Sequence, residues 1–313
     1  MDMTGRTIPN FFLIGPPKAG TTAVAETLSK HPEIFISDPK EPDFFVYQGG
    51  NPYGWDAKGK DSLDWYLGLF EAARSHTAVG DASPYYICCY HVAEQIYRFN
   101  PDARIIAILR NPVYRAFSMY RYWHTNSPRE LSASDFIASF QSELLGSPFE
   151  FQQEARVGWL KDTGFYAKHL KRYLDLFPRE QVKAMFYEDL IGDPKGFYQS
   201  IYRHLGVSPD DGYAAVNREI NVTVERRWKR LHSLANRGYH GPIAKIAKSV
   251  PAGRYLRRLR RSLNEANIKP KSQELAFPQD RYAELIATYD EDITMLEEML
   301  GIDLQGWRTG TTR

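Results

Sequence analysis

A lysine inside a glycine- and threonine-rich turn is the strongest chemical signal in the sequence. The apolar run at residues 10–15 is followed by Pro16-Pro17, and Lys18 then precedes Gly20-Thr21-Thr22. A strand, a tight turn and a helix start form the usual frame of a phosphate-binding loop, because the first N–H groups of a helix attract anions. We therefore expect an anion site at this turn, between a strand at 10–15 and a helix at 20–30.

The spacing of this turn differs from that of nucleotide-triphosphate loops, which follow the pattern G-x-x-x-x-G-K-[ST]. Gly15 and Gly20 have the right separation, but Thr21 stands in the lysine position and the cation has moved back to Lys18. The turn still predicts phosphate binding. The displaced lysine argues against magnesium-assisted phosphoryl transfer, and an ordinary turn with a solvated lysine is the alternative.

A second candidate anion site follows the apolar run at 104–109. Arg110 comes directly after this run, and Ser118 follows eight residues later within a helix expected over 112–124. A guanidinium group offers a planar fork of donors to phosphate oxygens. Loop and helix can therefore grip one anion together, although a sheet-edge arginine and a surface serine would explain the same two residues.

Taken together, the strings Pro17–Thr22 and Ile105–Ser118 resemble the motifs of sulfotransferases that use 3′-phosphoadenosine 5′-phosphosulfate (PAPS). That family carries P-K-x-G-T-T after its first strand, and an arginine followed eight residues later by a serine after a later strand. The resemblance is clear over residues 10–206. It implies PAPS as donor, adenosine 3′,5′-bisphosphate (PAP) as product, and no required metal. The residues that it implies for the 5′-phosphosulfate are Lys18, Ala19, Gly20, Thr21 and Thr22, and those for the 3′-phosphate are Arg110 and Ser118.

The string Lys40-Glu41-Pro42-Asp43-Phe44-Phe45 resembles the K-E-x-x-F-F segment of the heparan-sulfate-type branch. In that branch the glutamate is taken as the general base, which implies that Glu41 removes the acceptor's proton. Lys40 and Asp43 then contact the acceptor or tune Glu41. A surface turn with solvated charges is the alternative, and His124 is a rival base of the kind that animal cytosolic sulfotransferases use.

The string Gly80–Tyr86 resembles the E-K-[ST]-x-x-Y segment of the same branch, but Ala82 stands in the lysine position. If that lysine assists the sulfo group, Lys18, Lys40 or a backbone donor must compensate here. Further candidates for acceptor contact are Ser83, Tyr85, Tyr86 and Tyr166. For the two adjacent tyrosines a place in the core or at the rim is an equal alternative, and for Tyr166 a structural role is favoured.

The alternation of apolar runs and helical patterns predicts the fold class. Strands are expected at 10–15, 77–80, 104–109 and 182–187, and helices at 20–30, 91–98, 112–124, 165–176 and 195–205. This order predicts an α/β fold, with a P-loop-like parallel sheet flanked by helices on both faces in a single domain over residues 1–313. Ligands of such sheets bind beyond the carboxyl ends of the strands, where both candidate anion sites lie.

Three parts are expected within the 313 residues: a core at about 8–206, an irregular basic segment at about 207–275, and a C-terminal packing helix at about 278–300 that ends at Gly301. Although the net charge is +2, residues 226–261 carry 12 of the 40 Lys and Arg residues and no Asp or Glu. This stretch either closes over the nucleotide through Arg226 and Arg227, attracts an anionic acceptor or membrane surface, or is a solvated basic face. Nucleic acid is not an expected partner, because no nucleic-acid-binding module is recognised.

The two cysteines, Cys88 and Cys89, are adjacent, which argues against a disulfide framework and fits a reducing compartment. No secretory signal or apolar run of membrane-spanning length is visible, so a cytoplasmic, bacterial-type protein is expected. The sequence does not determine the oligomeric state.

The predicted function is direct, in-line transfer of a sulfo group from PAPS to a hydroxyl or amine, with Glu41 as base. The expected acceptor is a carbohydrate, a glycolipid or a small natural product. The alternatives are a kinase-like P-loop phosphotransferase and a non-catalytic nucleotide- or polyanion-binding protein.

Overall fold

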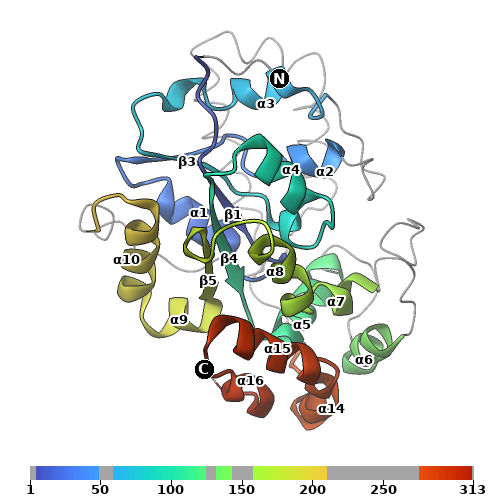
Figure 1. Cartoon of the computed structure of the whole chain (residues 1–313). Coiled ribbons are helices and arrows are strands. Elements are labelled where there is room, and N and C mark those ends of the chain that lie inside the picture. Colours follow the sequence, from blue (N-terminus) through green and yellow to red (C-terminus); the bar gives the residue numbers. More distant parts are fainter. Residues whose placement is uncertain (1–4, 49–58, 125–131, 143–157, 210–274, 312–313) are drawn as a thin grey trace, which may run out of the picture. The chain divides into compact units, whose positions relative to one another are not determined.

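A parallel sheet forms the centre of the computed structural model (Figure 1), which describes residues 5–48, 59–124, 132–142, 158–209 and 275–311. The chain divides into two compact units. The first comprises residues 1–119, 134–221 and 277–313 and contains the whole sheet, and the second comprises residues 120–133 and 222–276. The expectation that residues 1–313 form a single domain stays a prediction.

The sheet has five strands in the order β2-β3-β1-β4-β5, and every neighbouring pair is parallel. The strands are β1 (Phe11–Ile14), β2 (Ile34–Ile36), β3 (Ala78–Asp81), β4 (Arg104–Leu109) and β5 (Val182–Phe186). The predicted parallel sheet is therefore confirmed. The edge strand β2 was not predicted, because its three residues are too few to show a periodic pattern.

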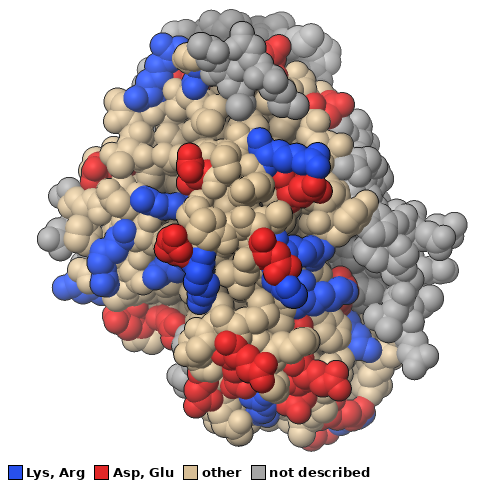
Figure 2. Space-filling view, viewed as in Figure 1, with Lys and Arg blue, Asp and Glu red and all other residues tan. Residues whose placement is uncertain are grey.

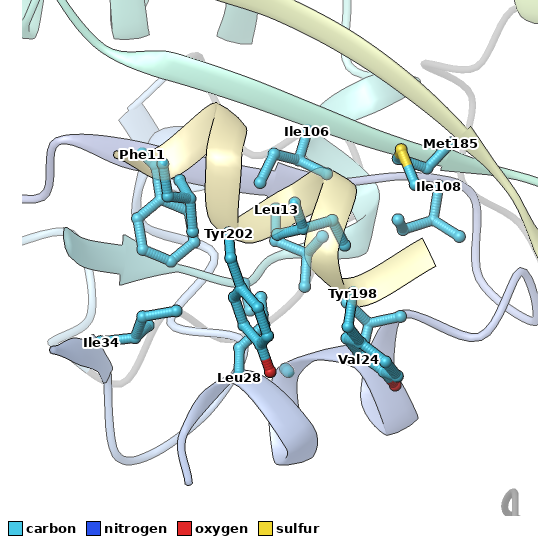
Figure 3. Packing of buried hydrophobic residues seen from close by; sticks show 14 of the residues in the cluster. Phe11, Leu13, Val24, Leu28, Ile34, Ile106, Ile108, Met185, Tyr198 and Tyr202 are labelled. Carbon is cyan, nitrogen blue, oxygen red and sulfur yellow. The ribbon is translucent and has the colours of Figure 1, made fainter. Parts of the chain in front are cut away.

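Helices cover both faces of the sheet. On one face, α1 (Thr21–Leu28) and α10 (Pro194–Leu205) pack against alternate strand residues such as Phe11, Leu13 and Ile106 (Figure 3). On the other face, the ring of Phe12 contacts Phe45 of α2 (Phe44–Gln48) and Tyr86 of the 3₁₀ helix η2 (Pro84–Ile87). Neighbouring residues of β1 thus point into two separate apolar layers, as expected for a strand buried on both sides.

The remaining helices belong mainly to the first unit, and one of them continues into the second. They are α3 (Leu63–Gly68), η1 (Glu71–Ala73), α4 (Val92–Phe99), α5 (Pro112–His124), α6 (Ala133–Gln141), α7 (Gly158–Asp162), α8 (Tyr166–Leu174), η4 (Arg179–Gln181), α9 (Tyr187–Gly192), η6 (Gln279–Arg281), α14 (Tyr282–Ala287), α15 (Asp290–Leu300) and α16 (Gln305–Thr309). The five helices predicted between residues 20 and 205 are all present, with ends that differ by a few residues.

The prediction of one C-terminal helix over about 278–300 was wrong, because the helix is interrupted between α14 and α15. Tyr289 precedes α15, is fully buried, and donates from its hydroxyl to the carbonyl oxygen of Lys161 at 3.0 Å. This tertiary contact outweighs the continuous helical pattern of the sequence. The expected end at Gly301 is present, with φ of 67°.

The surface carries mixed charges on the face shown in Figure 2, with acidic side chains gathered over the C-terminal helices. Exposed acidic residues of these helices include Glu284 of α14 and Asp290, Glu291 and Glu298 of α15. In the described part of the chain, no helix has the combined length and apolar character needed to cross a membrane. The basic stretch 226–261 lies outside the described residues.

Candidate functional site

The sheet topology brings the two predicted anion sites together. Strands β1 and β4 are neighbours with Phe12 opposite Ile105 and Ile14 opposite Ala107. After β1 the chain leads to β2 on one side of the sheet, and after β4 it leads to β5 on the other. The turns that follow β1 and β4 therefore flank the point where the connections diverge, which is where open α/β sheets bind their ligands.

Glycines shape the turn after β1. A Cβ atom on Gly15, which has φ of 143°, would lie 2.4 Å from the carbonyl oxygen of Ile108 in β4. Gly20 precedes α1 with φ of 96°. The first helical bond runs from the N–H of Val24 to the carbonyl oxygen of Gly20 at 3.2 Å. The N–H groups of the turn before Val24, including those of Thr21 and Thr22, therefore have no acceptor within α1 and are placed to bind an anion.

Ala19 differs from the other predicted loop donors. Its N–H already donates to the carbonyl oxygen of Pro16 at 3.1 Å, and its side chain is fully buried. Ala19 therefore stabilises the turn itself. Thr21 is buried, whereas Thr22 and Lys18 are half-buried.

Arg110 makes direct contact with this turn. Its Nη1 donates to the carbonyl oxygen of Lys18 at 3.1 Å, and its guanidinium carbon lies 4.4 Å from the ring centroid of Tyr187. The hydroxyl of Tyr166 donates to the carbonyl oxygen of Arg110 at 2.6 Å. Burial lowers the pKa of Arg110, and the nearby Tyr187 and Glu188 oppose that shift. The carbonyl oxygen, the guanidinium plane and Nη1 of Arg110 thus each have a partner. Ser118 lies half-buried on α5.

Tyr187, the first residue of α9, lies against both predicted motifs. A Cβ atom on Gly20 would come within 2.9 Å of the Tyr187 ring, and the same ring carries the guanidinium of Arg110. From the sequence, this tyrosine belongs to a string, Phe186–Leu190, that is expected to be architectural, because nothing in its local pattern shows which loops meet it.

The acceptor-side candidates begin with Lys40 and Glu41, between β2 and α2. The ammonium of Lys40 donates to Oγ1 of Thr22 at 3.4 Å and forms an ion pair with the carboxylate of Glu41. Lys60, a second cation that the sequence did not single out, donates to the carbonyl oxygen of Glu41 at 3.5 Å. Lys40 therefore connects the phosphate-binding turn with the predicted base.

Backbone strain gathers at the same candidates. In the described ranges, the non-glycine residues with positive φ are Lys18 at 75°, Glu41 at 62° and Asp43 at 55°. Such a conformation costs roughly 1–3 kcal/mol per residue and persists only where the surroundings enforce it, most often at functional sites.

Asp43 is buried and forms no ion pair among the described residues, although the charges of Lys60 and Lys40 act on it. The residue is 7% exposed, and Oδ1 of its carboxyl group has no hydrogen-bond partner among the described residues. Burial raises the pKa of Asp43 to about 8, and the charges of Glu41 and Asp81 add to this effect. The main-chain N–H of Asp43 donates to Oγ of Ser83 at 3.2 Å.

Asp81 is the fully buried last residue of β3, and three hydroxyl groups donate to it. Those of Tyr66 and Tyr86 donate to Oδ2, each at 2.8 Å, and that of Ser83 donates to Oδ1 at 2.7 Å. Burial raises the pKa of Asp81 to about 6, while these hydrogen bonds oppose the shift. Ser83 and Tyr86 are fully buried, so they support the site from within the protein interior. Tyr85 is half-buried.

For three of the predicted site residues, no side chain is described. Arg226 and Arg227 fall outside the described residues, and so does the side chain of His124, the last residue of α5. Among the described residues, no group of three or more His, Cys, Asp or Glu is placed to hold a metal ion. Tyr166 is buried and acts here on the backbone of Arg110.

Comparison with known proteins decides the family. The model of the sulfotransferase domain matches residues 9–227. This chain belongs to the sulfotransferase family. A crystal structure of a sulfotransferase from Alicyclobacillus acidocaldarius superposes with a TM-score of 0.66 and 28% identity, covering 96% of this chain and 99% of that one. The chain is thus a sulfotransferase by sequence and by fold, and the kinase-like alternative is excluded.

Curated relatives of this sulfotransferase act on heparan sulfate according to their names. Human bifunctional heparan sulfate N-deacetylase/N-sulfotransferase 2 is 28% identical over 215 residues, which are 67% of this chain and 23% of the relative. Mouse heparan sulfate glucosamine 3-O-sulfotransferase 6 is 27% identical over 202 residues, which are 64% of this chain and 53% of the relative. The chain therefore spans about a quarter to about half of the length of these relatives.

Proposed function

We propose that this sulfotransferase uses PAPS as donor and transfers its sulfo group to a hydroxyl or amine, with a carbohydrate as the first candidate acceptor. The contact between Arg110 and the carbonyl oxygen of Lys18 carries the proposal. It joins the two loops that would hold opposite ends of one nucleotide. The names of the curated relatives favour a carbohydrate over the other candidates, a glycolipid or a small natural product.

The residues fit a donor with two separate anionic ends. The N–H groups at the start of α1 and the side chain of Lys18 would hold the 5′-phosphosulfate, with the hydroxyls of Thr21 and Thr22 beside them. Arg110 and Ser118 would hold the 3′-phosphate. PAPS would supply an activated sulfo group whose leaving group is a phosphate.

Lys18 would stabilise the transition state. Negative charge develops on the leaving phosphate, and a cation fixed beside it lowers the barrier without reorganising. The positive φ of Lys18 supports this role, because the strained backbone is retained at the turn where a phosphate would bind.

Glu41 would accept the proton of the attacking hydroxyl or amine, and Lys40 would assist. The Lys40 ammonium lies between Oγ1 of Thr22 and the carboxylate of Glu41, so it can orient the base and offer positive charge to the sulfo oxygens. It thereby compensates for Ala82, which stands where relatives of the heparan-sulfate type have a lysine.

Direct binding and transfer measurements test the proposal. Calorimetry should show binding of PAP and indifference to ATP with Mg²⁺. Radiolabelled PAPS should then transfer its label to N-deacetylated heparan sulfate, or to a component of a cell extract that mass spectrometry identifies by its gained sulfo group. Binding of PAP without transfer to any acceptor pool would favour the non-catalytic alternative, and failure to bind PAP would refute the donor assignment.

A further inference from the structure

The segment between β2 and α2 holds a conformation that its own residues disfavour. Glu41 and Asp43 have positive φ, and Pro42 between them is buried. An L-residue keeps such a backbone only where neighbouring structure over-determines it. The hold on this segment must therefore come from residues outside it.

Asp81, at the end of β3, reaches the segment through two hydroxyl groups. Ser83 donates to Oδ1 of Asp81 at 2.7 Å and accepts from the N–H of Asp43 at 3.2 Å. Tyr86 donates to Oδ2 of Asp81 at 2.8 Å and accepts from the N–H of Phe45 at 3.4 Å. Each hydroxyl carries one proton, and donating that proton to Asp81 turns the oxygen lone pairs toward the main-chain N–H groups.

All the side chains of this network are buried, away from bulk water. Asp81, Ser83 and Tyr86 are each 0% exposed. Chains of hydrogen bonds away from water stabilise their members and fix their directions. Strand register supports the same geometry, because β2 and β3 are paired with Ile36 opposite Gly80, next to Asp81.

We infer that Asp81 and Ser83 are positioning residues that hold the Glu41–Asp43 backbone in the conformation needed for sulfo transfer. The inference rests on the proposed function, since that function makes Glu41 the base. Asp81 acts through Ser83 on the N–H of Asp43, two residues after Glu41, and touches neither donor nor acceptor. A small displacement of a catalytic group by loss of such support has a large effect on rate.

Matched substitutions separate positioning from general stability. Ser83→Ala removes the link between Asp81 and the N–H of Asp43, and Ser83→Thr keeps the hydroxyl. Tyr66→Phe is the control, because the hydroxyl of Tyr66 donates to Asp81 at 2.8 Å and its loss leaves both links to residues 43–45 in place. The readouts are hydrogen exchange at the Asp43 amide, the dissociation constant of PAP, the melting temperature, and PAP release from PAPS with water as acceptor.

Ser83→Ala should speed exchange at the Asp43 amide about tenfold and slow PAP release about 10- to 100-fold. PAP affinity should change less than about threefold, because the donor loops are untouched. Tyr66→Phe should lower the melting temperature about as much as Ser83→Ala does. Its rates of exchange at the Asp43 amide and of PAP release should stay near the wild-type values. Ser83→Thr should keep both near those values as well.

If Tyr66→Phe slows PAP release as much as Ser83→Ala does, the inference is overturned, because the network would then have only a structural role. Unchanged exchange at Asp43 in Ser83→Ala would overturn it too. If the wild type fails to bind PAP, the proposed function fails instead. The exchange measurement needs no donor and would still decide whether Ser83 holds the segment.

Discussion

Nη1 of Arg110 donates to the main-chain carbonyl oxygen of Lys18 across 3.1 Å, although 92 residues separate them in the sequence. The same guanidinium lies on the ring of Tyr187, which also contacts the turn at Gly20. The arginine expected to bind the 3′-phosphate therefore also supports the turn expected to bind the 5′-phosphosulfate. The two parts of the proposed nucleotide site are therefore in direct contact.

This connection predicts that Arg110→Lys weakens binding at both ends. A lysine cannot lie flat on Tyr187 and donate to the carbonyl oxygen of Lys18 at once. We expect about a tenfold or greater loss of PAP affinity by calorimetry. Adenosine 5′-phosphosulfate, which has no 3′-phosphate, should also bind less tightly. Unchanged affinity for this truncated donor would show that Arg110 serves the 3′-phosphate alone.

Lys18→Ala should reduce turnover far more than donor binding. Loss of a preorganised charge at a developing anion typically costs about 100- to 1,000-fold in kcat. The check is kcat and KM for PAPS, with Lys30→Ala as control, because Lys30 is an exposed lysine just after α1. Turnover within a fewfold of the wild type would remove Lys18 from the catalytic machinery.

Glu41→Gln should stop transfer and spare the nucleotide. The amide keeps the shape of the carboxylate but cannot accept a proton, so PAP affinity should stay near the wild-type value while kcat falls about 100-fold or more. Lys40→Met should lower kcat as well, because it removes the cation between Thr22 and Glu41. Weakened PAP binding with retained transfer in Glu41→Gln would point to a structural role for this residue.

Asp43→Asn should stabilise the folded protein in a pH-dependent way. The folded protein holds a proton on Asp43 up to a pKa of about 8, whereas the unfolded chain releases it near 3.8. Unfolding between these values releases a proton, so the free energy of unfolding falls as pH rises, by at most about 1.4 kcal/mol per pH unit. The asparagine removes this loss. The gain in melting temperature should be larger at pH 8 than at pH 5, and an equal gain at both would contradict the assignment.

Gly15→Ala should be strongly destabilising. The added Cβ would lie 2.4 Å from the carbonyl oxygen of Ile108, and the backbone at φ of 143° disfavours a side chain. We expect a loss of about 3 kcal/mol or more, measured by denaturant unfolding. Gly192→Ala, at a position where nothing lies within 4 Å of an added Cβ, is the matched control and should change little.

The sequence predicted the positions of the two loops proposed to bind the nucleotide, because local patterns carry each of them. Both loops follow apolar strands directly, and adjacent parallel strands place their following loops together. Four of the five strands, five of the helices and the meeting of the Lys18 turn with the Arg110 loop were therefore accessible from the sequence. The assignment of these residues to PAPS came from the family resemblance and stays a prediction.

The supports of the site were not accessible, because they depend on contacts between distant segments. Tyr187 meets Arg110 and Gly20 only in the folded chain, and nothing near Asp81 in the sequence shows that three hydroxyl groups donate to it. Tyr289 interrupts the C-terminal helix for the same reason, since its contact with Lys161 spans 128 residues.

The strand order also separates the two proposed halves of the site. The loops proposed to bind the donor follow β1 and β4, whereas Glu41 and Ser83 follow β2 and β3, which both lie on one side of β1. On the proposed assignment, the choice of acceptor would depend on the residues that follow β2 and β3, and the hold on the donor would depend on those that follow β1 and β4.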